Sequence, residues 1–378
     1  MNIHARLINK LEENQWDQYV SAHSQGSVYH LSGWQNVIGS AYGHKAHYLL
    51  AIDHSSSGKT GNKEGIVGIL PLIQLRHFFF GNRLVSMPYV DSAGILASSQ
   101  EAEESLSNKA IQTLEQCEGT TLELRQVEPL SSSRHFVKHC AAEKISSSEE
   151  DSVRPQFAVQ TDSRKARMGL FLPGSSNELF QSLKSKLRSQ VRKPLKEGLY
   201  ARIGGSELLD DFFSVLSVNM RDLGSPVHSK KFFRHVLSTF EDRSNIVLVF
   251  KGNRPLACSL VLGYRNVLNN PWASALKEYN FLSPNMLLYW TMLEYACDQG
   301  YEFFDFGRST PDEGTYKFKQ QWGAAPRPLY WYYVGRQEGQ AGEQSQRIRL
   351  RLAVRYWKKL PVSLTRVFGP MLRKHIGL

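Results

Sequence analysis

Two kinds of hydrophobic pattern alternate along the first 125 residues of this chain. An aromatic-rich segment at 29–38 predicts a helix. The apolar runs 48–52 and 66–75 predict two strands of a long hairpin with a polar loop at 55–65. Residues 101–117 then have the composition of a surface helix, and 121–125 (TLELR) read as a strand after it. We therefore expect helices and strands to be mixed in this half.

The second half begins with helical spacing. Four apolar side chains recur at intervals of three or four residues between positions 175 and 193, which predicts one helix over that range: Phe180, Leu183, Leu187 and Val191. Ser175 and Glu178 are spaced as a capping box, and Gly198 is placed to stop the helix. Pro194 is expected to kink or end it, because proline clashes with the carbonyl four residues earlier.

The order of elements then resembles that of the first half. Helices are predicted at 208–223 and 230–240, strands at 246–250 and 256–264, and a further strand at 272–276. A tight turn at Gly252-Asn253 joins the first two strands. Ser283-Pro284 starts another helix, which ends at Gly300, and a strand follows at 303–306. Segment 122–125 would correspond to 304–308, so we expect a weak internal duplication.

Length and composition fit a globular protein of two domains. The chain has 378 residues, of which 41% are hydrophobic and 21% charged. It contains no apolar run long enough for a spanning helix, and its first residues lack the apolar region of a secretory signal. Cys117, Cys140, Cys258 and Cys297 are far apart, as scattered thiols are in a reducing compartment. We therefore expect a cytoplasmic protein.

Charge is concentrated at the C-terminus. The formal net charge is +11, and residues 347–374 contain nine Lys or Arg and no acidic residue. These basic residues alternate with Leu, Val, Trp and Phe, which predicts a basic amphipathic segment on an anionic membrane surface. The alternatives are an edge strand and an ordinary docked helix. The protein would then be peripheral on the inner face of the membrane.

A second basic feature lies on the predicted helix at 175–193. Lys184, Arg188 and Arg192 recur every four residues and would form one stripe beside the apolar face. Such a stripe suits the phosphates of a nucleotide-linked precursor, a polyprenyl diphosphate or tRNA. A solvated helix face is the alternative interpretation.

Segment 303–333 mixes charged and aromatic residues most closely. Asp305 lies between Phe304 and Phe306, where a carboxylate is either paired, with Arg308 as the nearby candidate, or exposed in a cleft. Two Lys and a dense aromatic run follow within this segment. This region is where we expect part of a functional site.

Four segments together resemble the FemAB-like acyltransferases: 183–199 (LKSKLRSQVRKPLKEGL), 219–227 (NMRDLGSPV), 286–309 and 315–324 (TYKFKQQWGA). The resemblance covers roughly 15–333. More narrowly, the chain resembles the BioF2-like branch of this family, which is associated with exosortase/PEP-CTERM gene clusters. It implies an α/β (α+β) fold of two tandem GNAT-like domains, each a mixed, mostly antiparallel sheet flanked by helices. The expected domains are 1–163 and 164–338, followed by a basic tail at 339–378.

The resemblance also implies site residues. The Phe-Lys step of the family falls on Phe318-Lys319, so Lys319 becomes the candidate cation for the oxyanion of acyl transfer. A solvated Lys is the alternative. Tyr316 and Trp322 would line the pocket, or serve as core. Arg221 would line the substrate side, although capping explains it equally well. Asp305 is the candidate base, and Arg308 its candidate partner or a further substrate contact.

The best-understood members of this family transfer an amino acid from aminoacyl-tRNA to an amine of a peptidoglycan precursor. We therefore expect amide formation on a peptidoglycan or exopolysaccharide precursor, free or lipid-linked, with tRNA as a candidate partner and no DNA. The alternatives are an acyl-CoA-dependent N-acetyltransferase of an exopolysaccharide amino sugar, although no convincing pyrophosphate loop is found, and a non-catalytic assembly protein. No permanent cofactor or metal is expected, since His135, His139 and Cys140 lack a fourth ligand.

Overall fold

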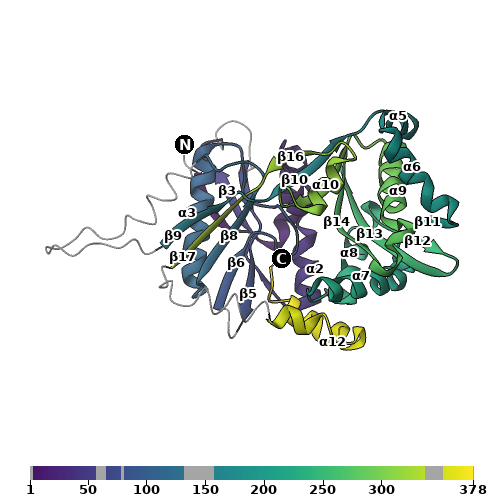
Figure 1. Ribbon diagram of the computed structural model, residues 1–378. Helices are drawn as coiled ribbons and strands as arrows, with labels where there is room; N and C mark the ends of the chain where they lie inside the picture. The colour runs from purple at the N-terminus through teal and green to yellow at the C-terminus, as the bar shows by residue number, and fades with distance from the viewer. Residues whose placement is uncertain (1–2, 57–64, 78–80, 132–156, 337–351, 378) are drawn as a thin grey trace. The chain divides into compact units, whose positions relative to one another are not determined.

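The computed structural model describes residues 3–56, 65–77, 81–131, 157–336 and 352–377 (Figure 1). The chain divides into two compact units. The first unit comprises Met1–Arg164, Pro328–Gln340 and Gly377–Leu378, and the second comprises Lys165–Arg327 and Ala341–Ile376. Neither unit is one continuous stretch of chain.

The first unit contains two sheets. The four-stranded sheet has the order β1 (Ile3–Leu7), β3 (Leu49–Asp53), β4 (Gly65–Leu70) and β7 (Leu96–Ala97). The six-stranded sheet has the order β2 (Lys45–Ala46), β5 (Ile73–His77), β6 (Gly81–Val85), β8 (Thr121–Gln126), β17 (Tyr330–Arg336) and β9 (Phe157–Asp162). The run 66–75, predicted as one strand, is therefore two strands in different sheets. Pro71 lies at the break, since proline cannot donate to a strand ladder.

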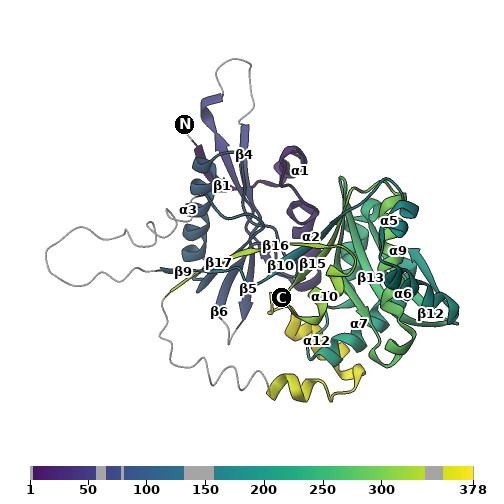
Figure 2. The ribbon, with the colours of Figure 1, turned by 45° about the horizontal axis from the view of Figure 1, so that its top comes forward.

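Helices of the first unit cover these sheets. They are η1 (Lys10–Glu12), α1 (Glu13–Ala22), η2 (Val28–His30), α2 (Gly33–Tyr42), η3 (His54–Ser56) and α3 (Gln100–Gln116). Figure 2 shows α3 beside β1. The buried residues Leu106 and Leu114 of α3 belong to one core with Leu49, Leu84 and Leu122 from both sheets. Segment 101–117 is thus a covering helix, as its pattern predicted.

A late segment of the chain completes the six-stranded sheet. β17 pairs antiparallel with β8 on one side, from Tyr330 opposite Gln126, and with β9 on the other, from Trp331 opposite Asp162. The Trp331 indole donates to the carbonyl of Asp91, and Tyr332 is part of the core. The aromatic run after residue 328 therefore serves the first unit.

The second unit is built on one seven-stranded sheet. Its order is β11 (Leu199–Gly204), β12 (Ser244–Lys251), β13 (Arg254–Tyr264), β14 (Val267–Ala275), β15 (Phe303–Ser309), β10 (Ala166–Phe171) and β16 (Ala325–Pro328). The pairs from β11 to β14 and the pair β10/β15 are antiparallel, whereas β14 and β15 run parallel. The predicted turn at Gly252 is present, with φ +55°.

Helices cover both faces of this sheet (Figure 1). They are α5 (Ser176–Ser182), α6 (Ser185–Lys196), η4 (Ser206–Leu208), α7 (Leu209–Leu223), α8 (Lys230–Thr239), η5 (Glu241–Arg243), η6 (Lys277–Leu282), α9 (Pro284–Asp298), α10 (Gly314–Gln320) and α12 (Val362–Arg373). α5 and α6 pack against α9, while α7 packs against β13 and β14 and contacts α8 and α12. Gly224 ends α7 with φ +80°, as predicted.

The single helix predicted over 175–193 is wrong. Leu183 and Lys184 are extended, with ψ of 143° and 144°, and they separate α5 from α6. Ser175 caps α5 by accepting from the amide of Glu178, as expected, and Gly198 has φ +76°. α6 continues through the buried Pro194 to Lys196, so the proline lies in the last turn instead of ending the helix.

Both units repeat one arrangement. In the first, α3 connects to β8, which lies parallel to β6; in the second, α9 connects β14 to the parallel strand β15. Parallel neighbours need such a helical crossover, whereas the other pairs can be hairpins. Segments 121–126 and 303–309 therefore occupy equivalent places, as the sequence order suggested.

Candidate functional site: the divergent strand pair of the second unit

β15 carries a bulge at its centre. Asp305 lies opposite Gly169 of β10 and Arg308 lies opposite Arg167, so two residues of β15 face one of β10. Gly307 has φ +74°, a conformation that favours glycine because it has no Cβ. Its amide donates to Asp305 Oδ1 over 2.8 Å. The sequence DFG thus forms a bulge that its own carboxylate holds in place.

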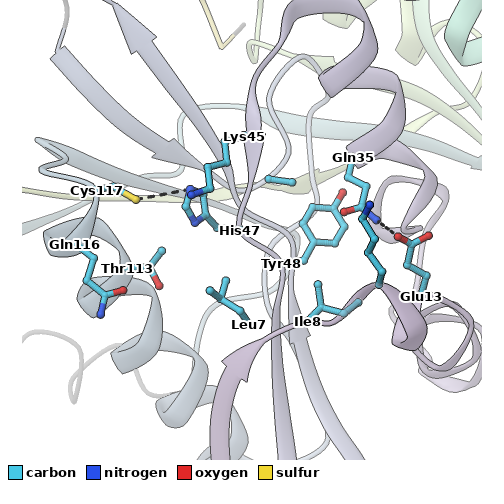
Figure 3. Close-up of a pocket in the computed structure, with 12 residues that line it drawn as sticks. Leu7, Ile8, Glu13, Gln35, Lys45, His47, Tyr48, Thr113, Gln116 and Cys117 are labelled. Atoms are coloured by element: carbon cyan, nitrogen blue, oxygen red, sulfur yellow. Dashed lines mark hydrogen bonds between the residues drawn. The ribbon is translucent and has the colours of Figure 1, made fainter.

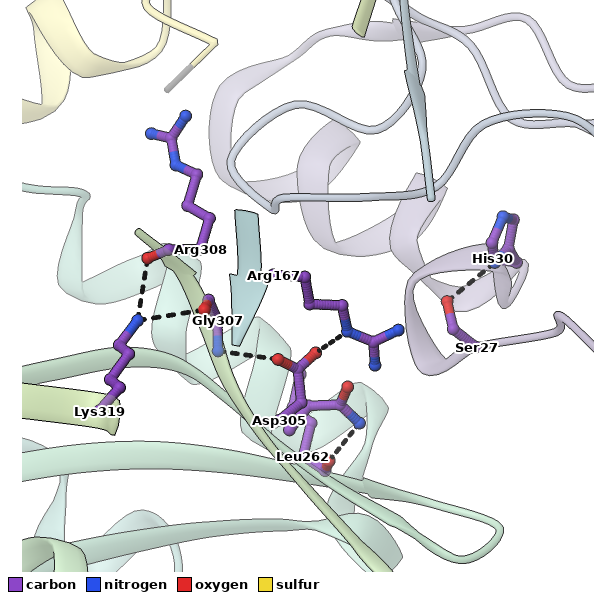
Figure 4. A network of polar contacts seen from close by, with 9 residues as sticks. Ser27, His30, Arg167, Leu262, Asp305, Gly307, Arg308 and Lys319 are labelled. Atoms are coloured by element: carbon purple, nitrogen blue, oxygen red, sulfur yellow. Dashed lines mark hydrogen bonds and ion pairs between the residues drawn. The ribbon is translucent and has the colours of Figure 1, made fainter. Parts of the chain in front are cut away.

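Asp305 is a buried, paired carboxylate. Its Oδ2 accepts from Nε of Arg167 at 2.7 Å, and the Asp305 residue is only 4% exposed (Figure 4). The sequence suggested Arg308 as the partner, and the structure supplies Arg167 instead, because β10 lies beside β15. Any part that Asp305 plays as a base stays a prediction.

Lys319 is also buried against this bulge. Its ammonium donates to the carbonyl oxygens of Gly307, at 3.1 Å, and Arg308, at 2.9 Å (Figure 4). The residue is 7% exposed although it lies on the short helix α10. A solvated Lys319, the alternative considered from the sequence, is therefore wrong: a positive charge is held beside β15, at the residues that follow Asp305.

An aromatic layer covers the same region. Tyr289 of α9 stacks on Phe306 with ring centroids 5.8 Å apart and meets Phe318 edge-on at 4.9 Å. Trp322 stacks on Tyr289 at 6.5 Å and is 2% exposed. Tyr316 is half-buried. Trp322 and Phe318 thus belong to one aromatic layer with Tyr289 and Phe306, which were not predicted as site residues.

The parallel strands β14 and β15 diverge next to this layer. Their pairing covers only Val267/Phe303, Leu268/Phe304 and Asn269/Asp305, yet β14 continues to Ala275 and β15 to Ser309. The pairing of β13 with β14 also shifts register between Leu260 and Leu262, opposite Asn270 and Pro271. The strands therefore separate just where Asn269 and Asp305 end the ladder.

Buried polar groups lie at this divergence. Asn270 is 5% exposed, and its Oδ1 accepts from the Ser259 hydroxyl at 2.7 Å. Several buried side-chain atoms of the described residues have no hydrogen-bond partner in the protein, among them Asn270 Nδ2 and Trp322 Nε1, although the Asn270 amide also interacts with the Tyr289 hydroxyl. Burial raises the pKa of Tyr289 to about 12, an effect that the neighbouring Asn270 amide opposes, so its hydroxyl stays protonated at neutral pH. Unsatisfied buried donors are rare in proteins and call for a ligand or water.

Asn270 and Tyr289 were not among the site residues predicted from the sequence. The available signal was the segment Asn269-Asn270-Pro271, because Asn and Pro are depleted in strand interiors and mark bulges there. Tyr289 had no signal, since an aromatic residue on an apolar helix is usually core.

Only part of the predicted basic stripe is exposed to solvent. Arg188 donates to the carbonyls of Gln181, at 2.9 Å, and Leu183, at 3.2 Å, so it caps the end of α5. The Arg192 guanidinium lies 5.1 Å from the centre of the Phe180 ring. Lys184 is exposed at the start of α6. The three residues therefore do not form one helical row.

Arg221 lies at the end of α7. Its Nε donates to Asp222 at 2.6 Å, and Nη1 donates to the Leu360 carbonyl at 3.4 Å. These contacts are those of a helix end, which was the alternative interpretation; a substrate contact for Arg221 stays a prediction.

Two cavities lie apart from these residues. The one in the first unit has a volume of about 330 Å³ and is lined by Glu13, Gln35, Lys45, His47, Tyr48 and Cys117, among others (Figure 3). Cys117 Sγ is 3.6 Å from His47 Nε2, but burial raises the pKa of Cys117 and lowers that of His47, so the pair is neutral. A second cavity, about 680 Å³, lies between η4, α7 and α8 of the second unit.

Among the described residues, no group of three His, Cys, Asp or Glu side chains could hold a metal ion. His135, His139 and Cys140 lie outside them. The helices of the described ranges include none long and apolar enough to cross a bilayer.

The class of protein follows from the second unit. Residues 161–320 match the family model described as an acetyltransferase (GNAT) domain. This span runs from within β9 to the end of α10, so it contains the divergent strand pair, the bulge and Lys319. Over these residues the chain is similar to a GNAT acetyltransferase domain, which supports a transferase activity.

Solved structures share the fold over nearly the whole chain. FemX is similar at 15% identity with a TM-score of 0.60, covering 87% of this chain and 96% of its own. L-PGS from Bacillus licheniformis (10% identity, TM-score 0.52) covers 94% of this chain and 99% of its own. A tandem GNAT protein from the clavulanic acid biosynthesis pathway (10% identity, TM-score 0.52) covers 89% and 99%. No curated protein matches the chain in sequence. The predicted fold class, two tandem GNAT-like domains, is confirmed.

Proposed function

We propose that this protein is an acyltransferase that forms an amide on an amine of a cell-envelope precursor, of peptidoglycan or exopolysaccharide. The divergence of β14 and β15 inside the GNAT domain carries this proposal. In this proposal an extended acyl donor pairs with the strand edges that the divergence leaves open, near the buried Asn270 amide. The acceptor is proposed from the sequence motifs, which resemble the FemAB-like acyltransferases, and the likeness to FemX supports the fold.

In this proposal the acyl carbonyl lies in the gap between the strands. Attack by the acceptor amine forms the new C–N bond and places negative charge on the carbonyl oxygen. Collapse breaks the bond from the carbonyl carbon to the donor's leaving oxygen or sulfur, and that atom takes up the proton that the amine loses. Asn270 Nδ2 and Trp322 Nε1 supply neutral donors to that oxygen, and the Lys319 ammonium supplies positive charge beside it. Asp305 and Arg167 act as positioning residues, because their ion pair and the Gly307 amide fix the bulge.

The exposed basic residues at the start of α6, Lys184 and Lys186, are the proposed contacts for donor or acceptor phosphates. The reaction would take place in the cytoplasm, where activated acyl donors are made. Arg308 contributes its backbone carbonyl to the Lys319 site, and a substrate contact for its side chain remains part of the proposal.

Lys319→Met tests the oxyanion assignment. Losing the cation removes one stabilising group, so we expect the transfer rate to fall by about two to three orders of magnitude and stability to fall by about 1.5–3 kcal/mol. The transfer rate is measured with an aminoacyl-tRNA or acyl-CoA donor and an amine-bearing precursor. Thermal unfolding measures the change in stability. Lys317→Met, an exposed residue of the same helix, is the matched control. A folded Lys319→Met enzyme with the wild-type rate would refute the assignment.

The donor separates this proposal from an acyl-CoA-dependent N-acetyltransferase acting on an amino sugar. The description of the matching family as acetyltransferase favours that second candidate. Calorimetric titration with acetyl-CoA distinguishes them: micromolar binding that is weakened by Asn270→Leu would select the CoA-dependent enzyme. Consumption of no donor with any envelope precursor would instead favour a non-catalytic assembly protein.

A further inference from the structure

α12 is fixed to the second unit through one narrow face. Its buried residues Thr365, Gly369 and Arg373 recur every four positions. A Cβ on Gly369 would lie 3.1 Å from the amide nitrogen of Val227, tighter than most Cβ contacts, so glycine favours this close approach. Arg373 Nε donates to Nε2 of the buried His228 at 3.0 Å. α12 is therefore a docked helix with a defined orientation. A docked helix was one of the alternatives that the sequence left open.

A second face of α12, next to the docked one, is apolar and exposed. Its side chains recur at helical spacing with these exposed fractions: Leu364 43%, Val367 62%, Phe368 51%, Met371 59% and Leu372 45%. At 100° per residue they form a continuous arc of the helix, beside the docked face. The preceding helical residues 352–357 add two more exposed apolar side chains, Leu352 at 48% and Tyr356 at 69%.

The charges around this arc have one sign. Arg355, Lys358 and Lys359 are exposed and Lys374 is half-buried, whereas Arg366 lies beside the docked face and donates to the Ser214 carbonyl at 3.4 Å. No acidic residue follows Glu343 in the sequence. A protein partner would need an acidic rim around an apolar groove. An anionic bilayer offers negative headgroups directly beside hydrocarbon, all over its surface. The combination favours lipid.

We propose that the outer face of α12 binds an anionic membrane surface, with Val367, Phe368 and Met371 inserted among the headgroups and the basic residues at 355–359 contacting lipid phosphates. Since α12 is docked by Gly369 and Arg373, binding would hold the second unit at the surface, where a lipid-linked amine is presented. The membrane contact does not depend on the proposed reaction.

Flotation of the full-length protein tests this proposal. The probes are vesicles of phosphatidylcholine alone and of equal parts phosphatidylcholine and phosphatidylglycerol. We expect wild type to float with the anionic vesicles and to be released by salt. Val367→Ser/Phe368→Ser/Met371→Ser should bind at least about tenfold more weakly, since each side chain loses apolar burial. Lys358→Gln/Lys359→Gln should weaken binding about fivefold per charge.

Phe281→Ser is the matched control, because Phe281 is 67% exposed elsewhere on the second unit; it should bind as wild type. All substituted side chains are exposed, so unchanged melting temperatures establish that the variants fold. Wild type that does not float, or a triple variant that floats equally, would overturn the proposal. Self-association that the triple variant abolishes, without flotation, would instead identify a second copy of the chain as the occupant. Loss of flotation with transfer activity intact on a soluble acceptor would leave the proposed function standing.

Discussion

Individual buried charges mark equivalent strands in the two units. In the first, Arg125 of β8 is 1% exposed, pairs with Glu123 at 2.7 Å and donates to the Val90 carbonyl at 2.6 Å. In the second, Asp305 of β15 pairs with Arg167. Removing one partner of such a pair leaves an uncompensated charge and is more costly than the pair is stabilising. Ion pairing therefore explains why charged residues stand inside the apolar strands LELR and FDFGR.

Buried histidines make stability depend on pH. Burial lowers the pKa of His30 to about 3, and it lowers the pKa of His228 well below its usual value, with Arg373 adding repulsion. Both residues stay neutral when folded but take up a proton near pH 6.5 when unfolded. Stability is therefore full above about pH 6.5 and falls as the pH falls, approaching about 1.4 kcal/mol per pH unit for each histidine.

Melting temperatures between about pH 7 and about pH 5 measure this effect. His30→Gln should flatten the decline, whereas His54→Gln, an exposed residue, should leave its slope unchanged. Equal slopes for wild type and His30→Gln would contradict the contribution of His30.

At the scale of elements, the break between α5 and α6 changes the role of the basic residues on α6, above all Arg188. Periodicity placed 175–193 on one helix, because apolar spacing is the same whether a helix is continuous or interrupted by two residues. The extended Leu183 and Lys184 turn Arg188 back onto α5. Its role is to satisfy carbonyls that the end of α5 leaves without intrahelical partners.

Arg188→Ala should therefore reduce stability by about 1–3 kcal/mol, because two carbonyls lose a charged donor. Lys186→Ala, on the same helix and exposed, should change stability by less than about 0.5 kcal/mol. Chemical denaturation of both variants provides the comparison. A larger loss for Lys186→Ala than for Arg188→Ala would show that the cap contributes little.

At the scale of the whole molecule, the chain order and the spatial order differ. β17 follows Lys165–Arg327, the main segment of the second unit, in sequence but lies between β8 and β9 in the first unit. The C-terminal Gly377 also returns, since its carbonyl accepts from the Tyr89 amide at 2.6 Å. The two units are thus linked by exchanged segments as well as by the direct connection.

Ending the chain after Arg327 should destabilise the first unit, although its first 164 residues would be intact. β9 would lose its only partner strand in the described sheet, and Tyr332 and Val334 would leave the core. Hydrogen exchange should show lost protection in β8 and β9 with the second unit's β12 and β13 still protected. Retained protection of β8 would refute this dependence.

The sequence by itself determined most elements, the α/β class and the segment that contains Asp305 and Lys319, because helix spacing, strand runs and Gly or Pro stops are local properties. It also showed the basic, apolar character of the C-terminus. Only the tertiary structure decided which residues meet: Arg167 with Asp305, Lys319 with the Gly307 and Arg308 carbonyls, Asn270 near Tyr289, and β17 in the first unit. Those pairings join distant parts of the chain, and they depend on strand order and crossover, which leave no periodic trace in the sequence.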